Sequence, residues 1–183
     1  VLFEERGEAK DELTFTSRSG DLKVSRLDGG VLGMDFPTLP TNAASVSPLL
    51  IEGLGGYPSE VRTAGDCLCV FDFEEIVREL QPDFRQLERL PFRGIIATAP
   101  ADNGKADFVS RFFAPSAGVA EDPVTGSAHC ILAPFWAKRL GKERLEARQL
   151  SQRGGRLVCE VRGDRVVIEG TAVTYLRGEV DLG

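Results

Sequence analysis

Apolar and polar residues alternate over short runs along most of the chain, which is the pattern of half-buried β-strands. This alternation predicts strands at residues 13–16, 22–24, 31–36, 61–63, 67–71, 94–98, 107–113, 156–161, 165–169 and 172–177. Glycine-containing turns at residues 19–21, 28–30 and 163–164 separate several of them. Strands therefore dominate the predicted α+β fold, with a few helices placed between them.

Helical spacing appears in four segments. The predicted helices span residues 41–54, 73–80, 82–90 and 126–140. Thr41 is the expected cap of the first, and Gly55-Gly56 is its expected stop. Residues 37–40 form a stiff connector and a candidate domain boundary.

The predicted helix at residues 126–140 has one broad apolar face. Its apolar side chains are mostly three or four positions apart: Ala128, Ile131, Leu132, Phe135 and Trp136. Pro134 removes one backbone hydrogen bond, which is tolerated only where neighbouring packing compensates. Such a helix, with its N-terminus open to a cleft, suits the inside of a curled sheet.

The first residues resemble the last turns of a helix. Val1–Glu5 runs into Arg6-Gly7-Glu8, a helix stop, so we expect a preceding part to be missing. The alternative is a short natural helix left after removal of an expression tag.

Composition limits the classes of function. The chain has 183 residues and a net charge of -6 without a long basic run, which argues against a nucleic-acid partner. No apolar run approaches the roughly 20 residues that cross a bilayer, and no signal peptide is visible. Cys67-x-Cys69 lacks the histidines or second cysteine pair of a zinc site, so we interpret these cysteines as core residues of a reduced, cytoplasmic chain.

Residues 113–130, which read F-A-P-S-A-G-V-A-E-D-P-V-T-G-S-A-H-C, carry the most chemical information. Two acids, a proline and a Thr-Gly-Ser turn directly precede the predicted helix. The first N–H groups of a helix have no internal partner and carry the positive end of its dipole, so they bind carboxylate or phosphate well. Glu121 or Asp122 could move protons next to such an anion.

The residues 121–130 also resemble the E-D-P-x-T-G-S-A-H signature of the phenazine-biosynthesis PhzF-like family. The resemblance continues at residues 16–20, 34–37, 111–115, 132–136 and 149–155, and so spans nearly the whole chain. It implies a diaminopimelate-epimerase-like fold, in which two lobes, each a curled mixed sheet around a central helix, enclose the site. It also implies a cofactor-independent isomerase or epimerase.

The same resemblance implies that the chain lacks part of the family pattern. The family's catalytic glutamate and its G-H-[AP]-T segment have no counterpart here, because His129 of the second-lobe motif is the only histidine. We therefore expect one complete lobe and part of another: residues 1–36 as the remainder of the first lobe, 37–170 as the second, and 171–183 as a closing strand that could return to the first.

The resemblance assigns Asp122 to acid–base chemistry and Ser127 to substrate contact and catalysis; the structural alternatives are a helix-capping acid and a helix-start hydroxyl. Gly126 would let the backbone approach the substrate, and Thr125 is either a cap or a substrate contact. Only one of Glu121 and Asp122 is expected to face the cleft, because adjacent side chains of an extended segment point opposite ways.

Other candidates have stronger structural alternatives. His129 could be a base or a support for the loop, and Cys130 is expected to be core. Arg111 and Arg153 could bind an anionic substrate or pair with acids, and Arg153 is the better substrate-binding candidate.

The sequence thus predicts an isomerase or epimerase, incomplete in this chain, that acts on a small anionic substrate without a cofactor or metal. A homodimer is expected from the resemblance alone. The alternative is a catalytically inactive binding module of the same fold. A metal- or thiol-dependent enzyme is disfavoured by the single histidine and the scattered cysteines.

Overall fold

The computed structural model describes residues 2–7, 9–17, 20–102 and 104–181. The strands are β1 (Glu12–Ser17), β2 (Gly20–Arg26), β3 (Leu32–Pro37), β4 (Asn42–Ala43), β5 (Glu60–Ala64), β6 (Asp66–Val70), β7 (Ile95–Pro100), β8 (Phe108–Phe113), β9 (Arg144–Gln149), β10 (Gly155–Arg162) and β11 (Arg165–Gly170). The helices are α1 (Pro48–Leu54), α2 (Glu74–Glu79), α3 (Phe84–Glu88) and α4 (Gly126–Leu140), with short 3₁₀ turns at Asp28–Gly30 and Pro115–Ala117.

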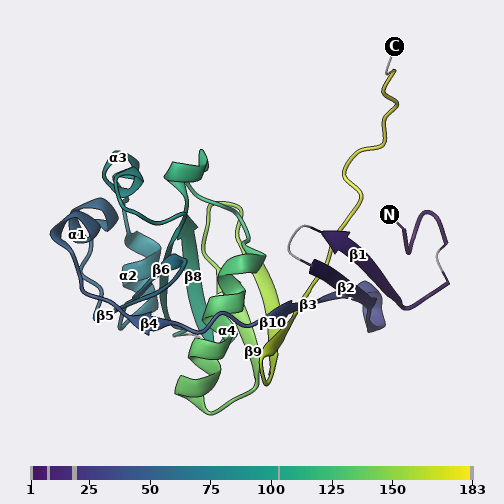
Figure 1. Cartoon of the computed structure of the whole chain (residues 1–183), viewed down its shortest axis with the longest axis horizontal. Helices are drawn as coiled ribbons and strands as arrows, with labels where there is room; N and C mark the ends of the chain where they lie inside the picture. The colour runs from purple at the N-terminus through teal and green to yellow at the C-terminus, as the bar shows by residue number, and fades with distance from the viewer. Residues whose placement is uncertain (1, 8, 18–19, 103, 182–183) are drawn as a thin grey trace.

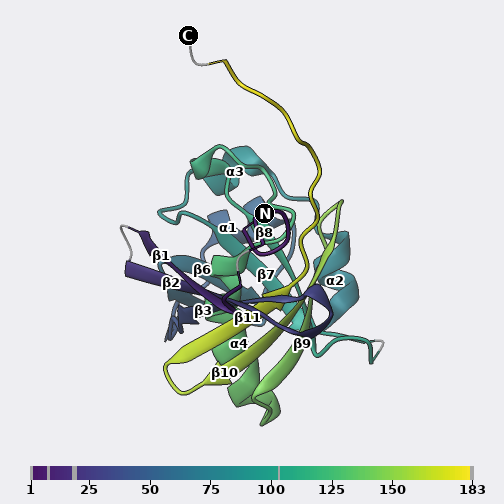
Figure 2. The same ribbon diagram turned by 90° about the vertical axis from the view of Figure 1, so that its right-hand side faces the viewer.

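All described strands belong to one mixed sheet with the order β1-β2-β3-β11-β10-β9-β8-β7-β6-β5-β4. The pairs β6–β7 and β8–β9 are parallel, whereas the other neighbours are antiparallel. The sheet curls around α4, so strands from β6 to β11 pack their inner side chains against this one helix (Figures 1 and 2). The expected α+β fold with a curled sheet around a central helix is confirmed.

Two hydrophobic cores lie on the two faces of the sheet, and alternate residues of each strand enter one or the other. On β6, Leu68 and Val70 face α4, whereas Cys67 and Cys69 face α1, α2 and α3. The two thiols are buried with their sulfur atoms 3.8 Å apart, so the interpretation of these cysteines as core residues is confirmed.

The first three strands extend from the main body. Figure 1 shows β1 and β2 with the N-terminus on one side, joined to the rest through the pairing of β3 with β11. β1 is the last strand at this edge of the sheet, and Phe15 and Met34 are partly exposed on it and on β3. The C-terminal segment leaves the body beside them, where Arg177 and Thr174 contact the Glu5 carboxylate.

The long helix expected at residues 41–54 is wrong in its first half. Asn42–Ala43 pairs with β5 as a short strand, and α1 begins only at Pro48. The Ser47 hydroxyl accepts a hydrogen bond from the Leu50 N–H at 3.2 Å, which makes Ser47 the cap in place of Thr41. Proline at the first helical position favours this start, because its missing N–H would have no partner there.

Two further expectations about the ends of the chain are wrong. Described residues 171–181 contain no strand, and Val173 and Tyr175 are 89% and 97% exposed, because no neighbouring strand pairs with this segment. Residues 2–5 form a turn rather than a helix end. The division of the chain at residues 36 and 170 stays a prediction.

The pattern did not predict a strand at Arg144–Gln149 either. β9 is built from Arg, Leu, Glu, Ala and Gln, which favour helices, yet its alternate residues Leu145, Ala147 and Gln149 are buried.

No helix among the described residues has the length and apolar character to span a membrane.

α4 places a neutral histidine in the core. The His129 ring is fully buried, and its Nδ1 donates to the Thr125 carbonyl oxygen at 2.7 Å. Burial lowers the pKa of His129 to about 4, although the hydrogen bond to Thr125 acts in the opposite direction. The histidine therefore supports the start of α4, and the interpretation of His129 as a loop support fits this position better than that of a base.

This burial predicts how stability depends on pH. Because the pKa of His129 is near 6.5 in the unfolded chain and about 4 in the folded one, the unfolded state binds an extra proton between these values. The free energy of unfolding should fall as the pH falls from about 6.5 to about 4, by up to roughly 1.4 kcal/mol per pH unit.

Urea unfolding of the wild type and of His129→Asn tests this effect, because asparagine can keep the donor to Thr125 without titrating. The stability advantage of the wild type should shrink as the pH falls through this window. Parallel curves for the two proteins would contradict the assignment.

Candidate functional site

The loop between β8 and α4 is held in shape by one buried amide. Gln149, which is 1% exposed at the end of β9, donates from Nε2 to the Asp122 carbonyl oxygen at 2.6 Å and to Thr125 Oγ1 at 3.1 Å. Its Oε1 accepts from the Thr125 N–H at 2.9 Å. The hydroxyl of Thr125 in turn donates to the Asp122 carboxylate. Gln149 thereby fixes both ends of the turn that carries Asp122.

A second set of contacts holds the middle of this turn. The Ser151 hydroxyl donates to the Pro123 carbonyl oxygen at 2.7 Å and accepts from the Gly154 N–H at 3.1 Å. Val124 packs on Gly155, where a Cβ atom would lie 2.1 Å from a Val124 methyl carbon. The Gly154-Gly155 pair therefore lets β10 begin directly beneath the loop.

Asp122, Thr125, Gly126 and Ser127 line one hollow of about 340 Å³ at the start of α4, which we call the site hollow. Among the described residues, no protein group accepts a hydrogen bond from the N–H groups of residues 126–128. Gly126 has open space where a side chain would lie. The hollow thus combines a carboxylate, a hydroxyl and a helix N-terminus that can bind an anion.

The structure adds Arg93 to this hollow, a residue that the sequence analysis missed. Arg93 Nη2 donates to the Ser127 hydroxyl at 3.2 Å, and its guanidinium lies over the Phe112 ring. Two hydrogen bonds, at 3.0 and 2.5 Å, join it to the carboxylate of Asp66, which is 3% exposed. Hydrogen bonding to Asp66 raises the pKa of Arg93, so a positive charge is fixed beside Ser127.

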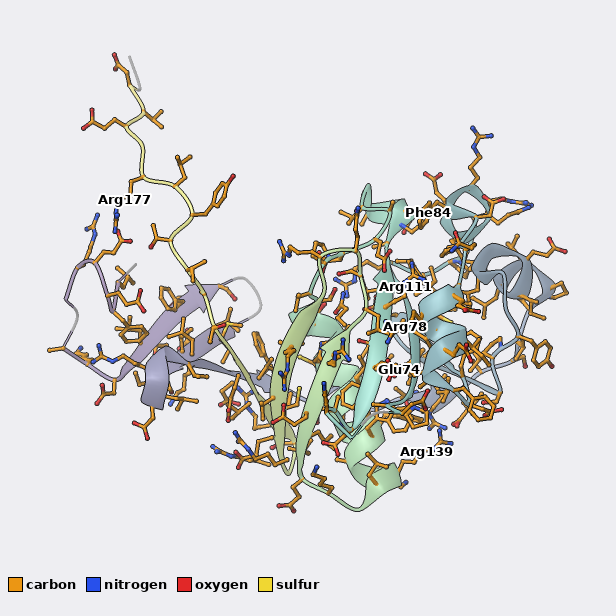
Figure 3. All side chains as sticks on the ribbon, turned by 180° about the vertical axis from the view of Figure 1, so that it is seen from behind. Glu74, Arg78, Phe84, Arg111, Arg139 and Arg177 are labelled. Carbon is orange, nitrogen blue, oxygen red and sulfur yellow. The ribbon has the colours of Figure 1, made fainter. Side chains whose placement is uncertain are left out.

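Glu121 points away from the site hollow. Its carboxylate forms a two-bond ion pair with Arg111 Nε and Nη2, at 2.7 and 2.9 Å, in a largely buried position. Arg111 also donates to the Leu80 carbonyl oxygen at 2.8 Å, beside the Glu74–Arg78 pair on α2 (Figure 3). The ion pair tethers the loop to α2, while the neighbouring Asp122 lines the hollow, so only one of the two adjacent acids faces it, as expected.

The remaining candidates lie elsewhere. Arg153 lines a different hollow, beyond the β9–β10 turn, and so the structure does not bring it together with Asp122 and Ser127. Cys130 is buried inside α4, and burial raises the pKa of its thiol to about 11. Among the described residues, no three His, Cys, Asp or Glu side chains gather as a set of metal ligands.

A larger hollow, of about 490 Å³, lies between α4 and β5. Its carboxylate, Glu60, is already paired with Arg62 at 3.0 Å and with Arg139 at 2.8 Å. Because its one lining carboxylate is already held by two arginines, the larger hollow offers no free acid, and the smaller site hollow is the better candidate for acid–base chemistry.

Comparison with known proteins places this geometry in a family. A protein of Pseudomonas aeruginosa named as an uncharacterized isomerase is 48% identical over 182 residues, which cover 100% of this chain and 69% of that protein. A crystal structure of a PhzF-family phenazine biosynthesis protein from Enterococcus faecalis has a TM-score of 0.94 at 41% identity, and the match covers 100% of this chain and 69% of that one.

A more distant structure shows the breadth of the fold. A hydroxyproline epimerase from Agrobacterium vitis has a TM-score of 0.53 at 13% identity, over 95% of this chain and 62% of that one, a likeness of fold alone. The model of the PhzC-PhzF family, described as phenazine biosynthesis-like protein, matches residues 1–178. The chain therefore belongs to the PhzC-PhzF family of phenazine biosynthesis-like proteins, whose fold it has.

Proposed function

We propose that the whole protein is a cofactor-independent isomerase or epimerase that moves a proton on a small carboxylate-bearing substrate. One observation carries this proposal: Asp122, Ser127, Arg93 and the open N-terminus of α4 converge on a single hollow of about 340 Å³. This volume lies within the range of small-molecule sites. A homodimer and a cytoplasmic location stay predictions.

Binding would begin with the substrate carboxylate. The fixed charge of Arg93 and the N–H groups at Gly126 and Ser127 all favour an anion at the same end of the hollow. Asp66 keeps the guanidinium in place, so little conformational entropy is lost when the substrate binds. The Ser127 hydroxyl lies next to Arg93 and can orient a polar substituent of the substrate.

Proton transfer would follow at Asp122. Its carboxylate already accepts a hydrogen bond from Thr125, and the tether to Gln149 keeps it directed into the hollow. Acid–base isomerisation of a carbon acid needs a second group on the opposite side of the substrate. By family resemblance this group is a glutamate outside the present chain, and closure of the two lobes would exclude water from both carboxylates.

The hollow itself favours the second candidate function for the chain alone, a binding module without catalysis. Its titratable lining groups are Arg93 and Asp122, so within the described residues Asp122 has no opposed acid–base partner there.

The 183-residue chain by itself should therefore give no useful proton exchange. We expect the chain, incubated in D₂O with amino acids and dihydro-hydroxy-aryl acids, to leave their C–H signals unchanged by NMR, because the half-site offers Asp122 no opposed acid–base group. Supplying the rest of the family chain, since the match covers 69% of the relative from Pseudomonas aeruginosa, in cis or as a second chain should restore exchange. Strong exchange by the short chain would overturn the need for a second group.

In the restored protein, Asp122→Asn should reduce turnover at least about tenfold, because a positioned acid–base group typically contributes hundredfold or more. Asp164→Asn, the same change at an exposed turn between β10 and β11, is the matched control. Cys130→Ala should leave turnover largely unchanged. Equal rates for the wild type and Asp122→Asn would remove Asp122 from the mechanism.

Replacement of Arg93 should separate binding from chemistry. Arg93→Gln should raise KM at least about tenfold with a smaller change in kcat, because an anchor that binds the substrate and the transition state equally affects mainly KM. Arg93→Lys keeps the charge and should recover part of the loss.

The amide analogue of the substrate supplies the control for this interaction. It lacks the carboxylate, so its KM should be similar in the wild type and in Arg93→Gln. An equal loss for the acid and its amide would show that Arg93 acts only through the structure of the loop.

A further inference from the structure

A second hollow, of about 380 Å³, shares no lining residue with the site hollow. Four arginines line it, Arg78, Arg148, Arg153 and Arg156, and no lining residue is acidic. We call it the arginine hollow. In a chain with a net charge of -6, four positive charges around one hollow are a marked local excess.

The sheet places two of these charges directly opposite each other. Arg148 on β9 and Arg156 on β10 are register partners in an antiparallel pair, so their side chains share a face of the sheet. Like charges in this position destabilise a sheet unless something neutralises them. Ala147 on β9 is buried on the α4 side of the sheet, so alternation directs the neighbouring Arg148 to the opposite side. Helix α2, which carries Arg78, packs on that opposite side (Figure 3).

The protein supplies little counter-charge here. Arg78 pairs with the buried Glu74, and the acid nearest to Arg156 is Glu146, at 4.0 Å between exposed side chains. Within the described residues, neither Arg148 nor Arg153 has an ion pair or a side-chain hydrogen bond. The guanidinium groups of Arg148, Arg153 and the weakly paired Arg156 thus line one hollow that contains no acidic side chain.

We propose that the arginine hollow binds a small phosphate-bearing anion. Guanidinium forks from β9, from the β9–β10 turn and from β10 can each donate two hydrogen bonds to tetrahedral phosphate oxygens, whereas a single carboxylate offers only two oxygens in one plane. The hydroxyl of Ser151 is already engaged with Pro123, so recognition rests on the arginines. This site is separate from the proposed function and does not depend on it.

The hollow is mechanically linked to the loop of the candidate active site. Gln149 and Ser151 line the arginine hollow and also hold the carbonyl groups of Asp122 and Pro123. An anion bound to Arg148 and Arg153 would order the β9–β10 turn on which these two contacts depend.

Isothermal titration with inorganic phosphate and with pyrophosphate, at a fixed ionic strength of about 0.15 M, tests the proposal. We expect saturable binding of one pyrophosphate, tighter than that of phosphate. The double variant Arg148→Gln/Arg153→Gln should lose at least about tenfold in affinity, which is the loss of roughly 1.4 kcal/mol of binding free energy.

The matched control is Arg85→Gln/Arg89→Gln, which removes the same two charges from the exposed surface around α3. It should bind pyrophosphate like the wild type. If the double variant does not fold, Arg148→Gln and Arg153→Gln singly should each weaken binding about threefold, roughly half of the expected free-energy loss.

Three results would overturn the site. They are the absence of saturable binding, an equal loss of affinity in the two double variants, and tighter binding of malonate than of pyrophosphate, which would assign the hollow to dicarboxylates.

Discussion

The candidate site depends on the buried side-chain amide of Gln149. An amide has one acceptor and two donor hydrogens, and here all of them serve the turn that runs from Asp122 to Thr125. A buried amide without these partners would cost about 1–3 kcal/mol per unsatisfied group, so the turn and Gln149 stabilise each other. The direction of the Asp122 carboxylate, the start of α4 and the position of Ser127 all follow from this one contact between β9 and the loop.

Arginines near the loop differ in role because their partners differ. Arg111 lies between a carboxylate and backbone carbonyl groups, and this arrangement makes it a tether for Glu121. Arg93 is bound on one side by buried Asp66 and is left open toward Ser127 on the other, which makes it an anchor for an anion. Arg148 and Arg153 have no such partner among the described residues, and they therefore point to a ligand from outside the chain.

Most elements could be predicted from local pattern, and the failures have identifiable causes. The expected strands at residues 61–63 and 165–169 and the helix at residues 126–140 formed, because apolar periodicity and the buried face agree there. β9 was missed because its residues favour helices, although the alternation of Leu145, Ala147 and Gln149 was a usable signal. The strand expected at residues 172–177 did not form, since alternation cannot supply the neighbouring strand that pairing needs.

The sequence by itself determined the local chemistry: the acidic turn, the helix that follows it, the opposed directions of Glu121 and Asp122, and the family to which the motif belongs. Only the tertiary structure decided which distant residues meet that motif. Arg93 comes from the segment before β7 and Gln149 from β9, and the sheet order alone brings both to the start of α4. Arg153 lies close in sequence to Gln149 but does not hold the loop or line the site hollow, because the β9–β10 turn carries it beyond the loop. Sequence fixes which groups are available, whereas pairing across the sheet fixes which of them share a space.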